Sequence, residues 1–317
     1  MREIEMIESI PRFECSDGSP LMYDNDFYKS KLKNALHNDN IICLSRGEAR
    51  SQALNEIVFH PEILFDWGEK SIQAFQDNQS EEIRRFCEPG VIDKPLLIHF
   101  IKKYIEGLNA YYQEKVFLQR KIEDVNLFRK ELITKIETED DNEKLLIIKE
   151  WLIYALHTMQ EEEFELITPC ISCTYGEQRF NVAKKYGKGR DKQHHYYVIM
   201  DCWIEKDREG IAYRKATYVN EVLKQYKLKW RKDVDYEIML KFAIFPQRLV
   251  GYYVVEDDKI LKYVLNKHYV AMWNENTGFE IGEPVYIDQI IDFNKIMPYK
   301  TVYMDYGHGF SIAGKRR

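Results

Sequence analysis

The stretch DYEIMLKFAIFPQRLVGYYVV, residues 235–255, holds the strongest evidence on the fold. β-branched and aromatic residues fill two runs of strand length in it, and Pro246-Gln247-Arg248 separates the two runs. The segments 164–174 (FELITPCISCT) and 194–204 (HHYYVIMDCWI) have the same composition. The second half of the chain is therefore predicted to contribute four strands to a sheet.

Shorter helices are expected around these strands. Residues 25–40 have a helical pattern, and the apolar run 41–44 that follows is predicted to be a short buried strand ending at Ser45-Arg46-Gly47-Glu48. A helix is also expected after residue 174. Its buried face would carry residues at helical spacing, namely Phe180, Ala183 and Tyr186.

A longer helical region separates the early strand from the later ones. Apolar residues recur at helical spacing from 94 to 163. The chain between Arg46 and Ser172 is far longer than adjoining strands require. We therefore predict an α+β fold in which residues 1–317 form a single domain and residues 94–163 are a helical insertion.

Composition limits the class of protein. The chain has 317 residues, of which 45% are hydrophobic, so it can bury a core. A formal charge of −6 gives no overall attraction to nucleic acid or to a membrane. The first residues lack the basic start and apolar run of a signal peptide, and six cysteines are too few for a disulfide framework. A soluble, cytoplasmic protein with reduced thiols is expected.

Two common kinds of site are not expected. Cys170 and Cys173 have a C-x-x-C spacing, but residues three apart in a strand point to opposite faces and do not chelate one ion. A zinc site built from them with Cys202 and the His194-His195 pair is therefore not predicted. The sequence contains neither a G-x-x-x-x-G-K-[ST] phosphate loop nor a G-x-G-x-x-G motif, which argues against a kinase or a Rossmann oxidoreductase.

Three separated segments point to one chemistry. They are IICLSRG (41–47), PCISCTYGEQRFNVAKKYG (169–187) and the strand that opens with Asp235-Tyr236-Glu237. In this order they resemble the three pocket strands of ADP-ribosyltransferases of the arginine-serine-glutamate type. The resemblance implies an ADP-ribosyltransferase-like split β-sheet, with NAD bound as a substrate and without a metal.

The resemblance also implies a role for each residue. Arg46 would contact the phosphate and ribose of NAD, for which its rigid fork of donors is suited. Ser172 would hold Glu237, the catalytic carboxylate that hydrogen-bonds the ribose and stabilises the developing sugar cation. Asp235 stands where the family commonly has glutamate or glutamine. As a third catalytic candidate, its shorter carboxylate would position or deprotonate the acceptor, and which acceptor it suits is open. Ser172 is also a candidate for NAD binding, and the remaining NAD-binding candidates are Gly47, Thr174 and Tyr175.

The expected function is mono-ADP-ribosyl transfer from NAD to a macromolecule. The family includes bacterial toxins, toxin-antitoxin modules and phage-defence systems, so an antitoxin protein is a candidate partner. Two alternatives remain open. One is an NAD glycohydrolase that uses water as the acceptor, and the other is a non-enzymatic interaction protein whose helical region binds a partner.

A basic run suggests what the acceptor is. Residues 224–232 (KQYKLKWRK) lie where the family's target-recognition loop falls. We predict that Lys227, Lys229 and Arg231 contact phosphates, and that Trp230 or Tyr226 stacks an unpaired base of single-stranded RNA or DNA. Further cations that would widen this face are Lys184, Lys185, Lys188 and Arg190. An acidic protein target, or a solvated loop anchored by an aromatic residue, is the alternative.

Overall fold

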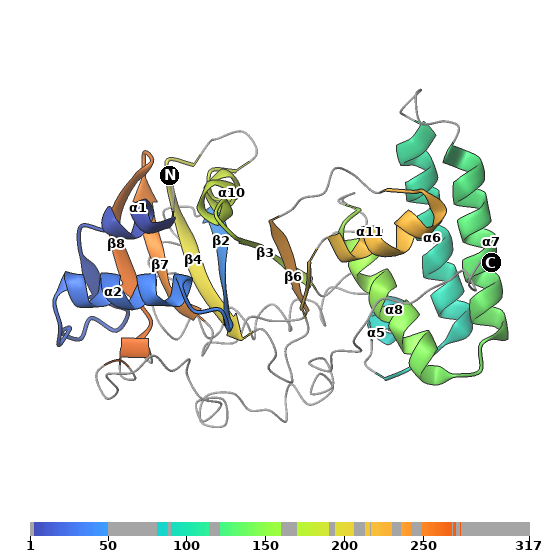
Figure 1. Cartoon of the computed structure of the whole chain (residues 1–317), viewed down its shortest axis with the longest axis horizontal. Coiled ribbons are helices and arrows are strands. Elements are labelled where there is room, and N and C mark those ends of the chain that lie inside the picture. Colours follow the sequence, from blue (N-terminus) through green and yellow to red (C-terminus); the bar gives the residue numbers. More distant parts are fainter. Residues whose placement is uncertain are drawn as a thin grey trace.

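The computed structural model describes most of the first 270 residues. The described ranges are 3–49, 81–87, 90–113, 121–159, 170–189, 194–205, 213–215, 217–229, 236–241, 249–267, 269–270 and residue 273. They form a mixed α+β structure built on one sheet (Figure 1). This confirms the predicted α+β class. Among the described residues, no helix has both the length and the apolar character needed to cross a membrane.

The sheet has eight strands in the order β1-β8-β7-β4-β2-β3-β6-β5. The strands are β1 (Phe13–Cys15), β2 (Ile41–Ala49), β3 (Cys170–Tyr175), β4 (Tyr196–Glu205), β5 (Tyr213–Lys215), β6 (Glu237–Lys241), β7 (Leu249–Glu256) and β8 (Lys259–Leu265). Neighbours are antiparallel except β1 and β8, which are parallel. The four strands expected in the second half of the chain correspond to β3, β4, β6 and β7.

The helices gather at the two ends of the sheet. They are α1 (Glu3–Glu8), α2 (Asn25–Leu36), α5 (Glu81–Cys87), α6 (Lys94–Gln113), α7 (Ile122–Thr138), α8 (Asn142–His157), α10 (Arg179–Gly187), α11 (Thr217–Leu223) and the 3-10 helix η2 (Lys224–Tyr226). Figure 1 shows α1 and α2 beside the part of the sheet that contains β8 and β7, and α10 over β2, whereas α6, α7, α8 and α11 lie beyond β6. Strands β3 and β6, which are inner strands next to the β5 edge, therefore lie on the side of the sheet that faces α6, α7, α8 and α11.

The helices α6, α7 and α8 form a helical block with its own core. Their buried side chains share one hydrophobic cluster with those of α11 and η2, and Met239 of β6 joins the same cluster. These helices fall within the predicted insertion at 94–163, although residues 114–120 and 160–163 lie outside the described part. Because Met239 is shared, the block packs directly on the sheet.

Helix α8 is the central element of the helical block. Asp141 caps its first turn by accepting a hydrogen bond from the backbone nitrogen of Glu143 (3.0 Å). Every residue from 148 to 156 is buried, as expected for a helix surrounded by others. The helix ends at His157, and this end lies against β3.

Strand β2 is longer than predicted. Its pairing with β4 runs without interruption from Ile41↔Glu205 to Ala49↔Tyr197, so Arg46 and Gly47 lie inside the strand and not at its exit. The prediction that the strand ends at Ser45-Arg46-Gly47-Glu48 is therefore wrong, because hydrogen bonds to β4 extend it beyond the apolar run.

The predicted buried face of α10 is wrong at one of its three residues. Phe180 and Ala183 are buried, but Tyr186 is 60% exposed.

A buried polar network fixes β2 beside β4 and α10. Arg179, the first residue of α10, forms an ion pair with Asp201 of β4 (3.0 Å), and both side chains are at most 2% exposed. Ser45 of β2 donates a hydrogen bond to the same carboxylate (3.0 Å), while Glu3 of α1 pairs with Arg179 from the other side (2.6 Å). Since buried charges are costly unless they are paired, this network specifies the position of Ser45, next to Arg46.

Candidate active site

The structure brings Arg46, Ser172 and Glu237 into one hydrogen-bonded group. They lie on β2, β3 and β6, which are consecutive neighbours in the sheet. The hydroxyl of Ser172 donates to Oε1 of Glu237 (2.6 Å), and Nη1 of Arg46 donates to the backbone carbonyl of Ser172 (2.7 Å). Ser172 therefore links Arg46 and Glu237, and all three residues were selected by the sequence analysis from distant segments.

The register of the strands explains these contacts. In the β3–β6 pair, Thr174 faces Glu237 and Ser172 faces Met239, so Ser172 and Glu237 are diagonal neighbours on one face. The registered pairs between β2 and β3 are Leu44↔Tyr175 and Ser45↔Thr174. One residue further along β2, the side chain of Arg46 binds the carbonyl oxygen of Ser172. A guanidinium thus joins the two strands where their registered pairing ends.

Glu48 is a contact of Arg46 that the sequence analysis did not anticipate. Its carboxylate lies 2.6 Å from Nε of Arg46, and the two side chains are 20% and 32% exposed respectively. Residues two apart in a strand share a face, which is the local signal for this pair. Glu48 and the Ser172 carbonyl together hold the guanidinium in one orientation at a partly exposed position.

His157 is the second residue that sequence reasoning missed. Its Nε2 lies 2.9 Å from the hydroxyl oxygen of Ser172, although it comes from the helical block. Burial and, to a lesser degree, the charge of Arg46 lower the pKa of His157 to about 4. The imidazole is therefore neutral at pH 7. Its spacing in the sequence gives only the pattern of a buried helix, so no sequence signal marks it.

The order of these hydrogen bonds distinguishes the site from a serine hydrolase. The single proton of the Ser172 hydroxyl points to Glu237, so the neutral His157 acts as the donor to Ser172 through Nε2. In a serine hydrolase the histidine lies between the serine and the carboxylate and removes the serine proton. Here the serine lies in the middle, and the arrangement orients the carboxylate.

The other predicted NAD-binding residues have contacts within the fold. Thr174 is 6% exposed, and its hydroxyl lies 2.9 Å from the carbonyl oxygen of Ser45 and 2.8 Å from that of Arg179. A Cβ atom on Gly47 would lie 1.7 Å from the carbonyl oxygen of Ala183, so this glycine lets α10 approach β2. Tyr175 packs partly buried against the cluster on the opposite face of the sheet. Contacts of these residues with NAD stay predictions.

The basic run is anchored to the helical block by its apolar residues. Tyr226 is 5% exposed, donates a hydrogen bond to Glu131 and packs against Phe128 with ring centroids 5.1 Å apart. The prediction that Tyr226 stacks a nucleic-acid base is therefore wrong, because its ring is in the core. Lys227 and Lys229 are exposed. Two of the predicted target-binding residues, Trp230 and Arg231, lie outside the described part of the chain, as does Asp235.

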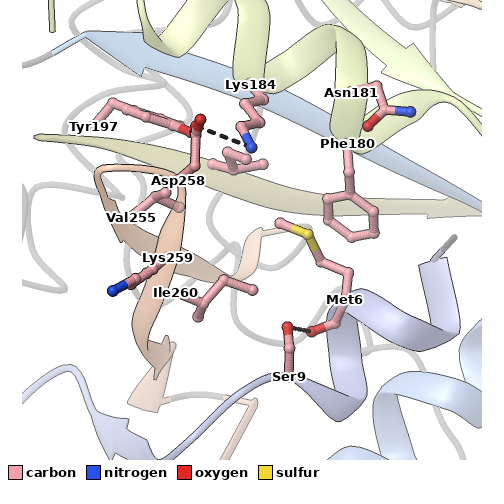
Figure 2. Close-up of a pocket in the computed structure, with 11 residues that line it drawn as sticks. Met6, Ser9, Phe180, Asn181, Lys184, Tyr197, Val255, Asp258, Lys259 and Ile260 are labelled. Carbon is pink, nitrogen blue, oxygen red and sulfur yellow. Dashed lines mark hydrogen bonds and ion pairs between the residues drawn. The ribbon is translucent and has the colours of Figure 1, made fainter. Parts of the chain in front are cut away.

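A pocket of about 300 Å³ lies away from these residues, between α1, α10 and the β7–β8 hairpin (Figure 2). Lys184 and Lys188 pair there with Asp258 (2.9 and 2.7 Å), which also accepts a hydrogen bond from Tyr197. These lysines therefore do not widen the basic face near η2, contrary to our expectation. None of the predicted catalytic, NAD-binding or target-binding residues lines this pocket.

The described residues contain no cluster of three or more histidine, cysteine, aspartate or glutamate side chains placed to bind a metal ion. Cys173 is buried in the cluster on the opposite face of the sheet, and burial raises the pKa of its thiol to about 12. Cys15, Cys43, Cys173 and Cys202 are free thiols.

Neither protein-family models, nor curated proteins, nor solved structures gave a match to this chain.

Proposed function

We propose that this protein is an NAD-dependent mono-ADP-ribosyltransferase whose catalytic carboxylate is Glu237. The observation that carries the proposal is the contact of Arg46, Ser172 and Glu237 across three neighbouring strands. The sequence resemblance assigned complementary roles to these residues, and the geometry supports such roles. A fold of the ADP-ribosyltransferase type, with the helical block inserted between β2 and β3 in the sequence, is part of the proposal, although its strands form one continuous sheet and not the split sheet that was expected.

The reaction begins with cleavage of the bond between nicotinamide and ribose. The ribose then develops an oxocarbenium-like positive charge, which a fixed carboxylate stabilises more strongly than it binds neutral ribose. Ser172 holds Oε1 of Glu237 at 2.6 Å, so the carboxylate does not have to reorient as charge develops. Glu237 hydrogen-bonds the ribose, and nicotinamide leaves with the bonding electron pair.

Arg46 is proposed to bind the phosphate and ribose of NAD. Its guanidinium is oriented by Glu48 and by the carbonyl of Ser172, so its position relative to Glu237 is set before NAD binds. A phosphate close to Arg46 would be repelled by Glu48, which requires that the Glu48 side chain move or that the phosphate approach from the other edge of the guanidinium. The identity of residue 48 therefore affects NAD affinity.

The acceptor is proposed to be a nucleic acid, with single strands preferred over duplex. Lys227 and Lys229 are exposed on a segment whose backbone is held by Tyr112, through hydrogen bonds of 2.8 and 2.7 Å to the amide and carbonyl of Lys229. The chain then leads through Trp230 and Arg231 to Tyr236, which is 39% exposed and directly precedes Glu237. Exposed cations that precede the catalytic strand by a few residues in the sequence suit a polyanionic acceptor. A toxin or anti-phage effector acting in the cytoplasm is the proposed context.

The test is transfer of label from NAD, with Glu237→Gln as the inactive control. Purified protein is incubated with ³²P-labelled NAD and cell lysate, and the products are treated with nuclease or protease. The proposal is supported if the label is released by nuclease but not by protease. Label that only protease removes overturns the acceptor class but leaves the transferase in place. Free nicotinamide without labelled macromolecule identifies an NAD glycohydrolase, and the absence of both products refutes the enzyme assignment.

A further inference from the structure

The helical block reaches the proposed catalytic pair through His157. This residue ends α8, whose preceding turns are buried among α6, α7 and α11. Its Nε2 contacts the Ser172 hydroxyl at 2.9 Å, and that hydroxyl contacts Glu237 at 2.6 Å. Two successive hydrogen bonds therefore link the C-terminal end of α8 to the carboxylate.

The donor in each of these hydrogen bonds decides where the Ser172 hydroxyl proton points. A serine hydroxyl rotates about its Cα–Cβ and Cβ–Oγ bonds and has one proton to donate. A donor at its oxygen occupies one lone pair and leaves the proton directed at the carboxylate. Neutral imidazole with the proton on Nε2 supplies such a donor, and the lowered pKa of His157 keeps the ring neutral.

We propose that His157 is a positioning residue that orients the Ser172 hydroxyl toward Glu237, and that the helical block controls the site through this contact. The inference rests on the proposed function for its catalytic consequence, but the hydrogen-bond chain is a property of the protein alone. A shift of α8 along its axis withdraws the imidazole from Ser172 and lowers turnover.

A double-mutant cycle with Ser172 tests the inference. We expect His157→Ala to lower kcat for nicotinamide release about tenfold and to change KM for NAD less than threefold. His157→Gln restores most of the rate, since an amide nitrogen donates at a similar reach. In a Ser172→Ala background, His157→Ala causes no further loss, because the histidine acts only through the serine. Equal losses in both backgrounds, or wild-type kcat in His157→Ala, overturn the inference.

A matched control separates positioning from damage to the helix end. Thr158 adjoins His157, and its hydroxyl donates to the carbonyl of Ala155 within α8 (2.8 Å). We expect Thr158→Ala to have a kcat within about twofold of the wild-type value. Its unfolding temperature should be similar to that of His157→Ala. A loss of kcat in Thr158→Ala as large as that in His157→Ala assigns the effect to the helix end and overturns the inference.

A measurement that needs no enzymatic turnover distinguishes failure of this inference from failure of the proposed function. In ¹⁵N-histidine-labelled protein at pH 7, His157 should give a neutral ring protonated at Nε2, and Ser172→Ala should shift that nitrogen resonance. This result supports the contact even if NAD is not cleaved. A ring protonated only at Nδ1, or a charged ring, overturns the inference whatever the transferase assay gives.

Discussion

Replacing Glu237 with glutamine isolates the charge of the proposed catalytic carboxylate. The amide oxygen still accepts the hydrogen bond from Ser172, which is 2.6 Å long in the wild type, so local packing is retained. A carboxylate about 4 Å from a sugar cation contributes about 4 kcal/mol at an effective dielectric constant of about 20. Because Glu237 is only partly buried, solvent reduces this contribution, and we expect a loss in kcat of about 10² to 10³-fold.

The assay is nicotinamide release under single-turnover conditions, with NAD affinity measured by calorimetry. NAD affinity should stay within about tenfold and the unfolding temperature should be unchanged, since the lost interaction belongs to the transition state. Glu177→Gln is the matched control, because Glu177 is an exposed glutamate between β3 and α10. A Glu237→Gln enzyme that keeps near wild-type turnover would refute the assignment of the catalytic carboxylate.

Arg46→Ala is expected to weaken NAD binding about 10 to 100-fold, the range for lost hydrogen bonds to a charged group, and unchanged binding by calorimetry would mean that β2 is not a pocket strand. Gly47→Ala should lower the free energy of unfolding by about 1–3 kcal/mol, because the added methyl group collides with α10; urea denaturation measures this, and a change below about 0.5 kcal/mol would contradict the close approach. Lys227→Ala or Lys229→Ala should each reduce the salt dependence of acceptor binding by about one unit of slope on a log–log plot, and a slope equal to that of the wild type would remove the lysine from the interface. Trp230→Ala should impair labelling of the acceptor and leave NAD affinity unchanged, whereas an equal loss of both would argue against base stacking.

Local patterns predicted the longer elements of the fold. β3, β4, β6 and β7 contain runs of β-branched and aromatic residues, and α6 to α8 contain apolar residues at helical spacing. β1 and β5 have three residues each, too few for a periodic pattern, and they exist because neighbouring strands offer hydrogen-bonding partners. The same reason extends β2 beyond its apolar run, since β4 pairs with it as far as Ala49.

The errors in the proposed site have a common cause. Tyr226 lies in a basic run whose composition predicts exposure to solvent, yet its ring packs against Phe128 of α7. Lys184 belongs to another basic run, but the hairpin between β7 and β8 places Asp258 beside it. In each case the decisive neighbour comes from a remote segment, and the charge or composition of the surrounding residues carries no information about it.

The sequence by itself determined the α+β class, the helical region before the later strands, and the chain order of Arg46, Ser172 and Glu237. The resemblance led us to expect the contact of Ser172 with Glu237, which the structure contains. Only the tertiary structure decided that Glu48 pairs with Arg46 and that His157 contacts the Ser172 hydroxyl. The physical reason is that helix and strand patterns are periodicities among neighbouring residues, so the sequence displays them directly. Contacts between strands depend on their register, and contacts between a helix and a sheet depend on packing, and both are set by interactions over the whole chain.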